Sequence, residues 1–266
     1  GTIAGSVMGT YIGMLGGTDP AAKVLFATHL LSASVMAVPG SIVLAKMLCP
    51  QTEEATDHVA ISGKEKENSN ILDAISSGTV TGVKLMTNIA AMLLVFISLV
   101  SLANYITEGV IGRYTGLNDW IVKITDGKAQ GLTFQFILGV ITSPFMWLIG
   151  VPSQDIMLVG SLLGQKTILN EFVAYFQLQQ WKDAGLFMYE KSILMSTYIL
   201  CGFANISSIG ILLGGLGVLA PEKRGLISRI GVPAMIGGAL VSVLSATIIG
   251  MILGSVSYTH LTLPTI

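Results

Sequence analysis

The sequence predicts an all-α, polytopic helical membrane protein that contains a re-entrant helical hairpin and a broken transmembrane helix. Hydrophobic residues make up 52% of the 266 residues, charged residues make up 11%, and the mean hydropathy is +0.75, whereas a soluble domain carries about 25% charge. The apolar residues gather in windows 85–103, 193–219 and 230–253, near or above the roughly 20 residues that span a bilayer core. Helices are expected because backbone groups in lipid must be satisfied within the spanning segment.

Residues 1–49 of the chain predict two apolar helices. Residues 2–17 form a short glycine-rich run that ends at Gly16-Gly17, a typical helix terminus. Residues 21–49 form a second helix, which Pro39 is expected to bend. Mixed charges in residues 50–70 indicate a polar loop outside the bilayer.

A long helix is expected next, over residues 71–112. At 1.5 Å per residue it would reach about 60 Å, well beyond the roughly 30 Å hydrocarbon core, which suits a tilted scaffold element. Residues 113–130 are polar and rich in turn-forming residues. Residues 131–149 are aromatic and amphipathic, which indicates an interfacial helix.

The remaining elements within residues 113–253 are a hairpin at 152–182 and two last membrane helices at 187–219 and 224–253. Residues 254–266 (GSVSYTHLTLPTI) end in polar and β-favouring residues that do not continue the helix before them. We expect this tail to be non-native. The chain opens within an apolar run without a targeting segment, which favours a fragment of a longer protein.

Glu171 is the residue of greatest functional interest. In residues 160–181, apolar stretches too short to cross a bilayer flank a polar patch and the pair Asn170-Glu171, which predicts a re-entrant hairpin. A carboxylate at membrane depth is costly and marks a functional site by default. It would accept hydrogen bonds from substrate hydroxyls or help to bind a cation. The alternative is that this segment lies at the surface and Glu171 faces water.

The second interruption lies in CGFANISSIGILLGG, residues 201–215, where Asn205, Ser207 and Ser208 break an apolar run. Broken helices expose carbonyls and half-helix ends that bind ions and substrates in secondary transporters. Asn205 offers a donor and an acceptor, and Ser208 offers a hydroxyl. The alternative is a continuous helix whose small residues serve helix–helix packing.

Other functional classes leave little trace in the sequence. The net charge of −1 gives no basic footprint for nucleic acid, and the cysteines and histidines lack metal-site spacing. Metalloprotease, P-loop, dinucleotide-binding and serine-elbow motifs are absent. We therefore expect neither an enzyme nor an organic cofactor.

Four segments carry a family resemblance: TIAGSVMGTYIG, LLSASVMAVPGSIVLAKMLCP, LNEFVAY and CGFANISSIGI. In this order they resemble the concentrative nucleoside transporters, and the resemblance extends over residues 1–253. It implies a sodium-coupled importer of nucleosides, working as a homotrimer in a lipid bilayer. It also implies that residues 1–49, as a partial first repeat, and residues 113–253 belong to a mobile transport domain. The version here looks bacterial, which implies the cytoplasmic (inner) membrane.

The resemblance also assigns roles to individual residues. Glu171 matches the hairpin glutamate that binds ribose hydroxyls, and the aromatic and ribose-binding positions of the broken helix fall on Phe203, Asn205 and Ser208. Val7 and Met8 match residues that line the nucleobase side. The sodium-coordinating pair of the same helix falls on Thr2 and Ile3.

One large departure from the family is evident. The G-Q-T-E motif of the first hairpin, which reads the nucleobase and helps to hold sodium, is absent, as are the first three helices. Purine or pyrimidine preference therefore stays open. Two alternatives to sodium symport also stay open, namely a proton-coupled nucleoside symporter and a non-transporting membrane subunit or channel component.

Overall fold

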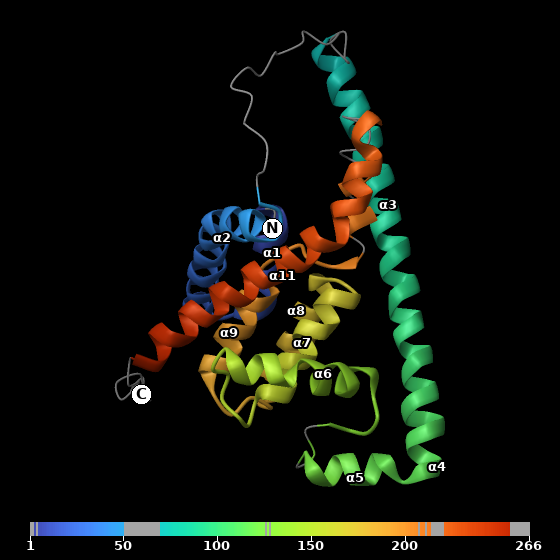
Figure 1. The fold of residues 1–266 in the computed structure, drawn as a ribbon, viewed down its shortest axis with the longest axis vertical. Helices are drawn as coiled ribbons and strands as arrows, with labels where there is room; N and C mark the ends of the chain where they lie inside the picture. Colours follow the sequence, from blue (N-terminus) through green and yellow to red (C-terminus); the bar gives the residue numbers. More distant parts are fainter. Residues whose placement is uncertain are drawn as a thin grey trace.

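The computed structural model describes residues 3, 5–50, 70–125, 127, 129–206, 208–210, 212–213 and 221–255. Within these residues the regular structure is entirely helical, which confirms the predicted all-α class. One long helix, α3 (Ile71–Asn104), runs along one side of the molecule, and most other helices gather beside it (Figure 1). The predicted loop 50–70 lies outside the described residues, apart from its two ends.

The first two helices are α1 (Gly5–Gly16) and α2 (Pro20–Leu48). Between them, Gly17 takes a positive φ of 54°, which glycine adopts without steric cost. The Asp19 side chain accepts a hydrogen bond from the Ala21 amide at 2.9 Å and caps α2. The predicted ranges 2–17 and 21–49 differ from these helices only at their ends.

The long helix predicted over 71–112 is present, but its helical type changes toward the carboxyl end. The chain stays helical, but Tyr105–Gly112 forms a π-helix, followed by α4 (Arg113–Thr115) and a turn at Gly116 with φ 72°. Asn118 supplies a physical reason, because its Nδ2 donates to the Glu108 carbonyl at 2.9 Å. A side chain that engages a backbone carbonyl favours such a local widening of the helix.

Residues 113–130 are also more ordered than the predicted turn-rich connection. They contain α5 (Leu117–Ile124), an amphipathic helix with Ile121 buried. A helix of this length shows too few turns for its apolar period to stand out in the sequence. The next helix, α6 (Phe134–Leu148), matches the helix expected at 131–149 and is capped by Thr133, whose Oγ1 accepts from the Phe136 amide at 3.1 Å.

The predicted hairpin region contains two short helices, α7 (Ile156–Ile168) and α8 (Glu171–Asp183), joined by Leu169 and Asn170. Then α9 (Glu190–Leu200) ends, residues 201–205 are non-helical, and helical backbone resumes at 206. The predicted helix 187–219 is therefore broken, as its polar interruption indicated. The alternative of a continuous packed helix is wrong.

The last elements are the 3₁₀ turn η2 (Pro221–Lys223) and α11 (Arg224–Ser255). The helix continues through residues 254–255, the first two residues of the predicted tail. Leu253 is buried against the core, and this packing sustains the last helical turn. Residues 256–266 lie outside the described chain.

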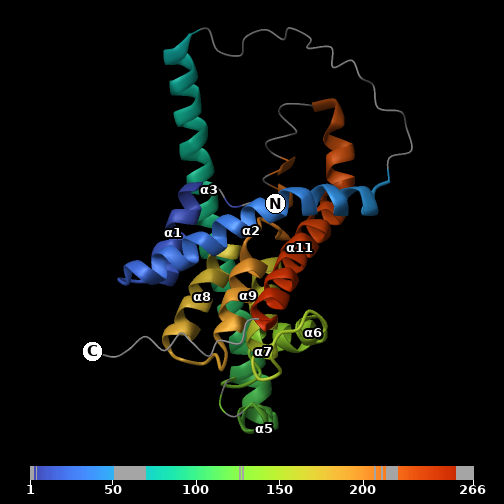
Figure 2. The same ribbon diagram turned by 90° about the vertical axis from the view of Figure 1, so that its left-hand side faces the viewer.

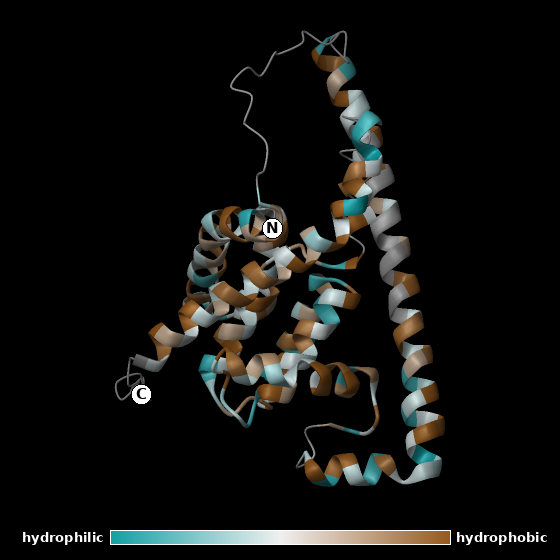
Figure 3. Cartoon of the chain, viewed as in Figure 1, coloured by the Kyte–Doolittle hydropathy of each residue, from teal (hydrophilic) through white to brown (hydrophobic). Residues whose placement is uncertain are grey.

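The helices pack so that α6 lies on α7, and α11 lies on α2 and α9; Figure 2 shows α9 and α11 side by side. Both α2 and α11 are long and apolar enough to cross a membrane. Apolar side chains are exposed along α3 as well, with Ile71 at 79% and Leu94 at 70% of their surface. Figure 3 shows that hydrophobic residues recur along this helix. These apolar outer surfaces suit a lipid environment or contact with further protein.

Candidate functional site

Glu171 opens helix α8, directly after the turn that joins α7 to α8. Asn170 caps this helix, since its side-chain oxygen accepts a hydrogen bond from the Val173 amide at 2.9 Å. The start of a helix carries a partial positive charge, which favours a carboxylate. Glu171 is only 4% exposed, so the alternative in which it faces water is wrong.

Asn205 and Ser208 organise the restart of the broken helix. The Ser208 amide donates to Asn205 Oδ1 at 2.7 Å, and the Ser208 hydroxyl donates to the Asn205 carbonyl at 2.6 Å. In the other direction, the Asn205 backbone amide donates to Ser208 Oγ at 3.3 Å. These reciprocal bonds satisfy polar groups that the break leaves outside a regular helix. Both residues are buried.

The two interruptions meet in space. Asn205 Nδ2 donates a hydrogen bond to Glu171 Oε2 at 2.9 Å, although the residues are 34 positions apart in the chain. The structure therefore brings Glu171, Asn205 and Ser208 together into one buried polar cluster. We call these three residues the Glu171 cluster.

The remaining predicted residues lie at varied places. Phe203 precedes the cluster in the non-helical segment and is 42% exposed. Val7 and Met8 are half-buried on α1 and pack against the core, and Ile3 is buried before that helix begins. Thr2 lies outside the described residues.

An aromatic contact places α1 beside the Glu171 cluster. Tyr11 stacks on Tyr175 of α8 with ring centroids 4.1 Å apart, and it meets the Phe172 ring at 6.3 Å. Phe172 directly follows Glu171. Because Val7 and Met8 lie one turn before Tyr11 on the helix, they share its face toward α8.

Sequence reasoning missed the importance of Lys166. It belongs to a stretch, residues 164–167, that was read only as part of a polar tip. In the structure its side chain is fully buried, and Nζ donates to the Ile199 carbonyl at 2.7 Å and to Ser242 Oγ at 2.9 Å. The available signal was a lysine next to an apolar stretch, residues 156–163, since fully buried lysines are rare.

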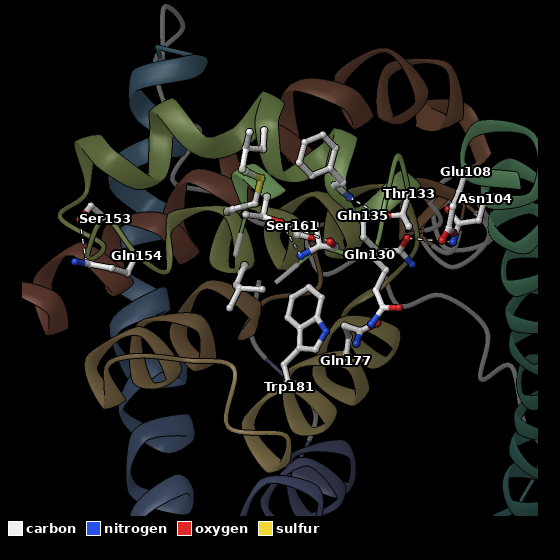
Figure 4. Close-up of a pocket in the computed structure, with 16 residues that line it drawn as sticks. Asn104, Glu108, Gln130, Thr133, Gln135, Ser153, Gln154, Ser161, Gln177 and Trp181 are labelled. Carbon is white, nitrogen blue, oxygen red and sulfur yellow. Dashed lines mark hydrogen bonds between the residues drawn. The ribbon is translucent and has the colours of Figure 1, made fainter. Parts of the chain in front are cut away.

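A separate cavity of about 580 Å³ lies between the end of α3 and helices α6, α7 and α8. Figure 4 shows its polar lining, which includes Asn104, Gln135, Gln177 and Trp181. The residues of the Glu171 cluster do not line it.

A helical fold in which a buried carboxylate meets the polar residues of a helix break is typical of secondary transporters. Residues 29–250 match the family described as "Na+ dependent nucleoside transporter C-terminus". The chain therefore belongs to this family of membrane transporters and corresponds to its C-terminal region.

Relatives and solved structures agree with this assignment. The chain is 38% identical to an uncharacterised transporter of Haemophilus influenzae, covering 95% of this chain and 56% of that protein. It is 37% identical to sodium/nucleoside cotransporter 1 of Rattus norvegicus, covering 94% of this chain and 38% of the rat protein. The chain thus spans about half or less of these relatives' length.

Among solved structures, a CNTnw variant in an outward-facing state matches with a TM-score of 0.76 and 34% identity, over 96% of this chain and 56% of that one. CNTnw in an inward-facing substrate-bound state matches with a TM-score of 0.73 and 33% identity, over 95% of this chain and 55% of that one. The arrangement of helices is therefore that of the CNT fold.

Proposed function

We propose that this chain is the C-terminal part of a secondary active transporter that imports nucleosides together with sodium ions. The observation that carries the proposal is the buried contact between Glu171 and Asn205. It joins an acceptor-rich carboxylate to an amide that both donates and accepts. Membership of a Na+-dependent nucleoside transporter family supplies the substrate class.

The Glu171 cluster suits the ribose of a nucleoside. Vicinal hydroxyls donate to a carboxylate and accept from an amide, so ribose would bond to Glu171 and Asn205 together. Such bonds are strong where water is excluded. Phe203, with an exposed ring beside the cluster, offers a surface for stacking on the base. Val7 and Met8 would line the nucleobase side from α1.

Sodium is proposed as the coupling ion on the strength of the family and of relatives named sodium/nucleoside cotransporters. Thr2 and Ile3 would contribute part of its site at the start of α1. Ligands of this kind, carbonyl and hydroxyl oxygens near unwound helix ends, suit a hard monovalent cation. The sodium gradient would bias the transport cycle through tighter binding of sodium to one conformational state.

The setting that we propose is the bacterial cytoplasmic membrane, with three copies of the full-length protein forming a homotrimer. Helices α7 and α8 would form a re-entrant hairpin that reaches the Glu171 cluster at membrane depth. The long helix α3 would be the scaffold. Movement of the substrate-binding helices past α3 would expose the cluster to each side of the membrane in turn.

The test is uridine and adenosine binding by a full-length protein that carries this sequence, in sodium and in choline buffers. We expect submillimolar binding that is tighter in sodium. Uptake into proteoliposomes with a sodium gradient or a proton gradient then distinguishes the coupling ion. Uptake driven only by the proton gradient would replace sodium symport with proton symport. The absence of any nucleoside binding would overturn the proposal and favour a non-transporting membrane subunit.

A further inference from the structure

Lys166 lies in the last turn of α7, just before the turn to α8, and its side chain is fully buried. In the described part of the chain its ammonium forms no direct ion pair, although the Glu171 carboxylate interacts with it electrostatically at longer range. It donates instead to two neutral oxygen atoms, the Ile199 carbonyl at 2.7 Å and Ser242 Oγ at 2.9 Å. Burial of a charge without a direct ionic partner is costly unless dipoles replace the lost water.

The Ile199 carbonyl is such a dipole. It lies in the last turn of α9, one residue before the helix ends at Leu200. The carboxyl end of a helix carries a partial negative charge and unsatisfied carbonyls. The neighbouring carbonyls in this turn accept other donors, which are the amides of residues 201 and 202 and the Tyr175 hydroxyl.

The Ser242 hydroxyl is oriented to accept from Lys166. Its own hydrogen is directed to the Gly238 carbonyl one turn earlier in α11, with an oxygen–oxygen distance of 3.2 Å. The Ser242 lone pairs are therefore available to the ammonium. The Lys166 Nζ thus joins α7, the end of α9 and α11 at one point.

Helices α7 and α8 both bond to the carboxyl end of α9. Lys166 of α7 bonds to the Ile199 carbonyl, and Tyr175 of α8 donates to the Thr197 carbonyl at 2.8 Å. The non-helical segment that begins at residue 201 leads directly to Asn205 and its contact with Glu171. Fixing the end of α9 therefore fixes the start of the segment that carries Asn205.

A half-helix carboxyl end and a hydroxyl oxygen are the ligands with which broken-helix transporters hold a free cation. We infer that Lys166 is a tethered cation: its ammonium occupies a latent monovalent-cation site formed by the Ile199 carbonyl and Ser242. Lys166 is then a positioning residue, which holds the broken helix so that Asn205 meets Glu171. Its effect on nucleoside affinity rests on the proposed function, whereas the latent cation site does not.

Shortening the side chain tests this directly. Lys166→Ala keeps Cβ and removes the atoms of an n-propylammonium ion, so this ion is a matched filler, and 1-propanol is its neutral counterpart. In the full-length protein we expect Lys166→Ala to lower nucleoside affinity by about tenfold or more. We expect n-propylammonium to restore affinity and to raise the melting temperature of this variant, whereas 1-propanol does neither.

Two variants serve as controls. Lys182→Ala removes a lysine of α8 that is partly exposed and paired with Asp183, and it should not respond to n-propylammonium. Lys166→Met fills the space of the lysine stem without a charge, so it should lose affinity without rescue. Wild-type affinity in Lys166→Met, or an equal response of Lys166→Ala to both fillers, or to neither, would overturn the inference.

A gentler variant covers the case in which Lys166→Ala does not fold. Ser242→Ala removes one acceptor of the ammonium, and Ser245→Ala on the same helix removes a buried hydroxyl that donates only to the Val241 carbonyl. We expect lower nucleoside affinity in the first variant alone, and equal affinities would contradict the inference. If wild-type protein binds no nucleoside, the proposed function fails, but the melting temperature of Lys166→Ala with n-propylammonium still tests the cation site.

Discussion

Asn205 Nδ2 lies 2.9 Å from Glu171 Oε2, and this hydrogen bond joins the first turn of α8 to the break between α9 and the helical backbone that resumes at 206. Each partner is independently set in place. Glu171 follows the Asn170 cap, and Asn205 exchanges hydrogen bonds with Ser208. The substrate chemistry that we propose therefore depends on a contact between two local irregularities, the turn between α7 and α8 and the break after α9. Neither irregularity alone would bring Glu171 and Asn205 together.

The first prediction concerns Glu171→Gln, which keeps the size of the side chain and removes its charge. Ribose hydroxyls would lose a charged acceptor, and hydrogen bonds to charged groups contribute about 1.5–3 kcal/mol. We expect nucleoside affinity to fall by roughly 10- to 100-fold, measured by calorimetry in sodium buffer.

Glu190→Gln is the matched control for this variant. Glu190 also begins a helix, α9, but it is exposed, so its loss of charge alters the helix dipole interaction without touching the cluster. Its affinity should equal that of the wild type. Equal affinity in Glu171→Gln would show that ribose does not bind at this carboxylate.

The second prediction concerns Phe203→Ala. An aromatic ring that is 42% exposed beside a buried polar cluster is available for stacking on a base, and such contacts are worth about 0.5–1.5 kcal/mol beyond area burial. We expect weaker nucleoside binding, no change in ribose binding measured by competition, and near-normal stability. Phe145→Ala on α6, with a ring that is 60% exposed, is the control, and equal effects of the two variants would count against stacking.

The sequence carried enough information to predict the helical class, the helix break and the residues of the Glu171 cluster, because polar residues within apolar runs are rare and costly in membranes. The π-helix at Tyr105–Gly112 was missed because it depends on a tertiary hydrogen bond from Asn118. The short helix α5 was missed because it has too few turns to show an apolar period. The burial of Lys166 was missed for a similar reason. Its acceptors lie 33 and 76 positions away in the chain, and spacing along one helix cannot reveal them.

The third prediction concerns Asp155, whose two carboxylate oxygens accept from the Met188 amide at 3.0 Å and the Tyr189 amide at 3.1 Å. Asp155 is fully buried and ties the start of α7 to the start of α9. Asp155→Asn replaces one acceptor with a donor, so a backbone amide is left facing a donor. We expect a loss of about 1–3 kcal/mol in stability, seen as a lower melting temperature, with the nucleoside dissociation constant nearly unchanged in the folded fraction.

Asp183→Asn is the control for Asp155, because the Asp183 side chain is 57% exposed and pairs only with the neighbouring Lys182. Its melting temperature should match that of the wild type, since exposed pairs contribute little. A large fall in nucleoside affinity in Asp155→Asn at full folding would instead place Asp155 in the binding machinery.

The fourth prediction concerns the close packing of α6 on α7. A Cβ added at Gly139 would lie 2.8 Å from the Met157 carbonyl oxygen, and one added at Gly160 would lie 2.6 Å from Thr142 Oγ1. Because the first of these neighbours is backbone, Gly139→Ala must separate the helices, and overpacking of this kind costs about 1–3 kcal/mol. We expect a lower melting temperature than for Gly225→Ala, where the added Cβ meets open space. Equal melting temperatures would show that the two helices separate without cost.

The last prediction concerns the connection between the long helix and the rest of the chain. Asn118 Nδ2 donates to the Glu108 carbonyl at 2.9 Å, and its Oδ1 accepts from the Leu132 amide at 2.9 Å. Asn118 thereby joins the π-helix that follows α3 to the segment that leads into α6. If α3 is the scaffold past which the binding helices move, the hydrogen bonds of Asn118 form a joint that connects this fixed helix to the moving helices.

We expect Asn118→Ala to slow nucleoside uptake into proteoliposomes several-fold. Equilibrium nucleoside affinity should stay within about twofold of wild type, because hinge positions far from the binding site alter the rates of conformational change. Thr115→Ala, which removes a hydroxyl that bonds only to the Ile111 carbonyl within its own helix, should leave both quantities unchanged. A parallel loss of affinity and uptake in Asn118→Ala would mean that the joint supports the fold of the binding helices, and an unchanged uptake rate would mean that this joint does not govern the motion.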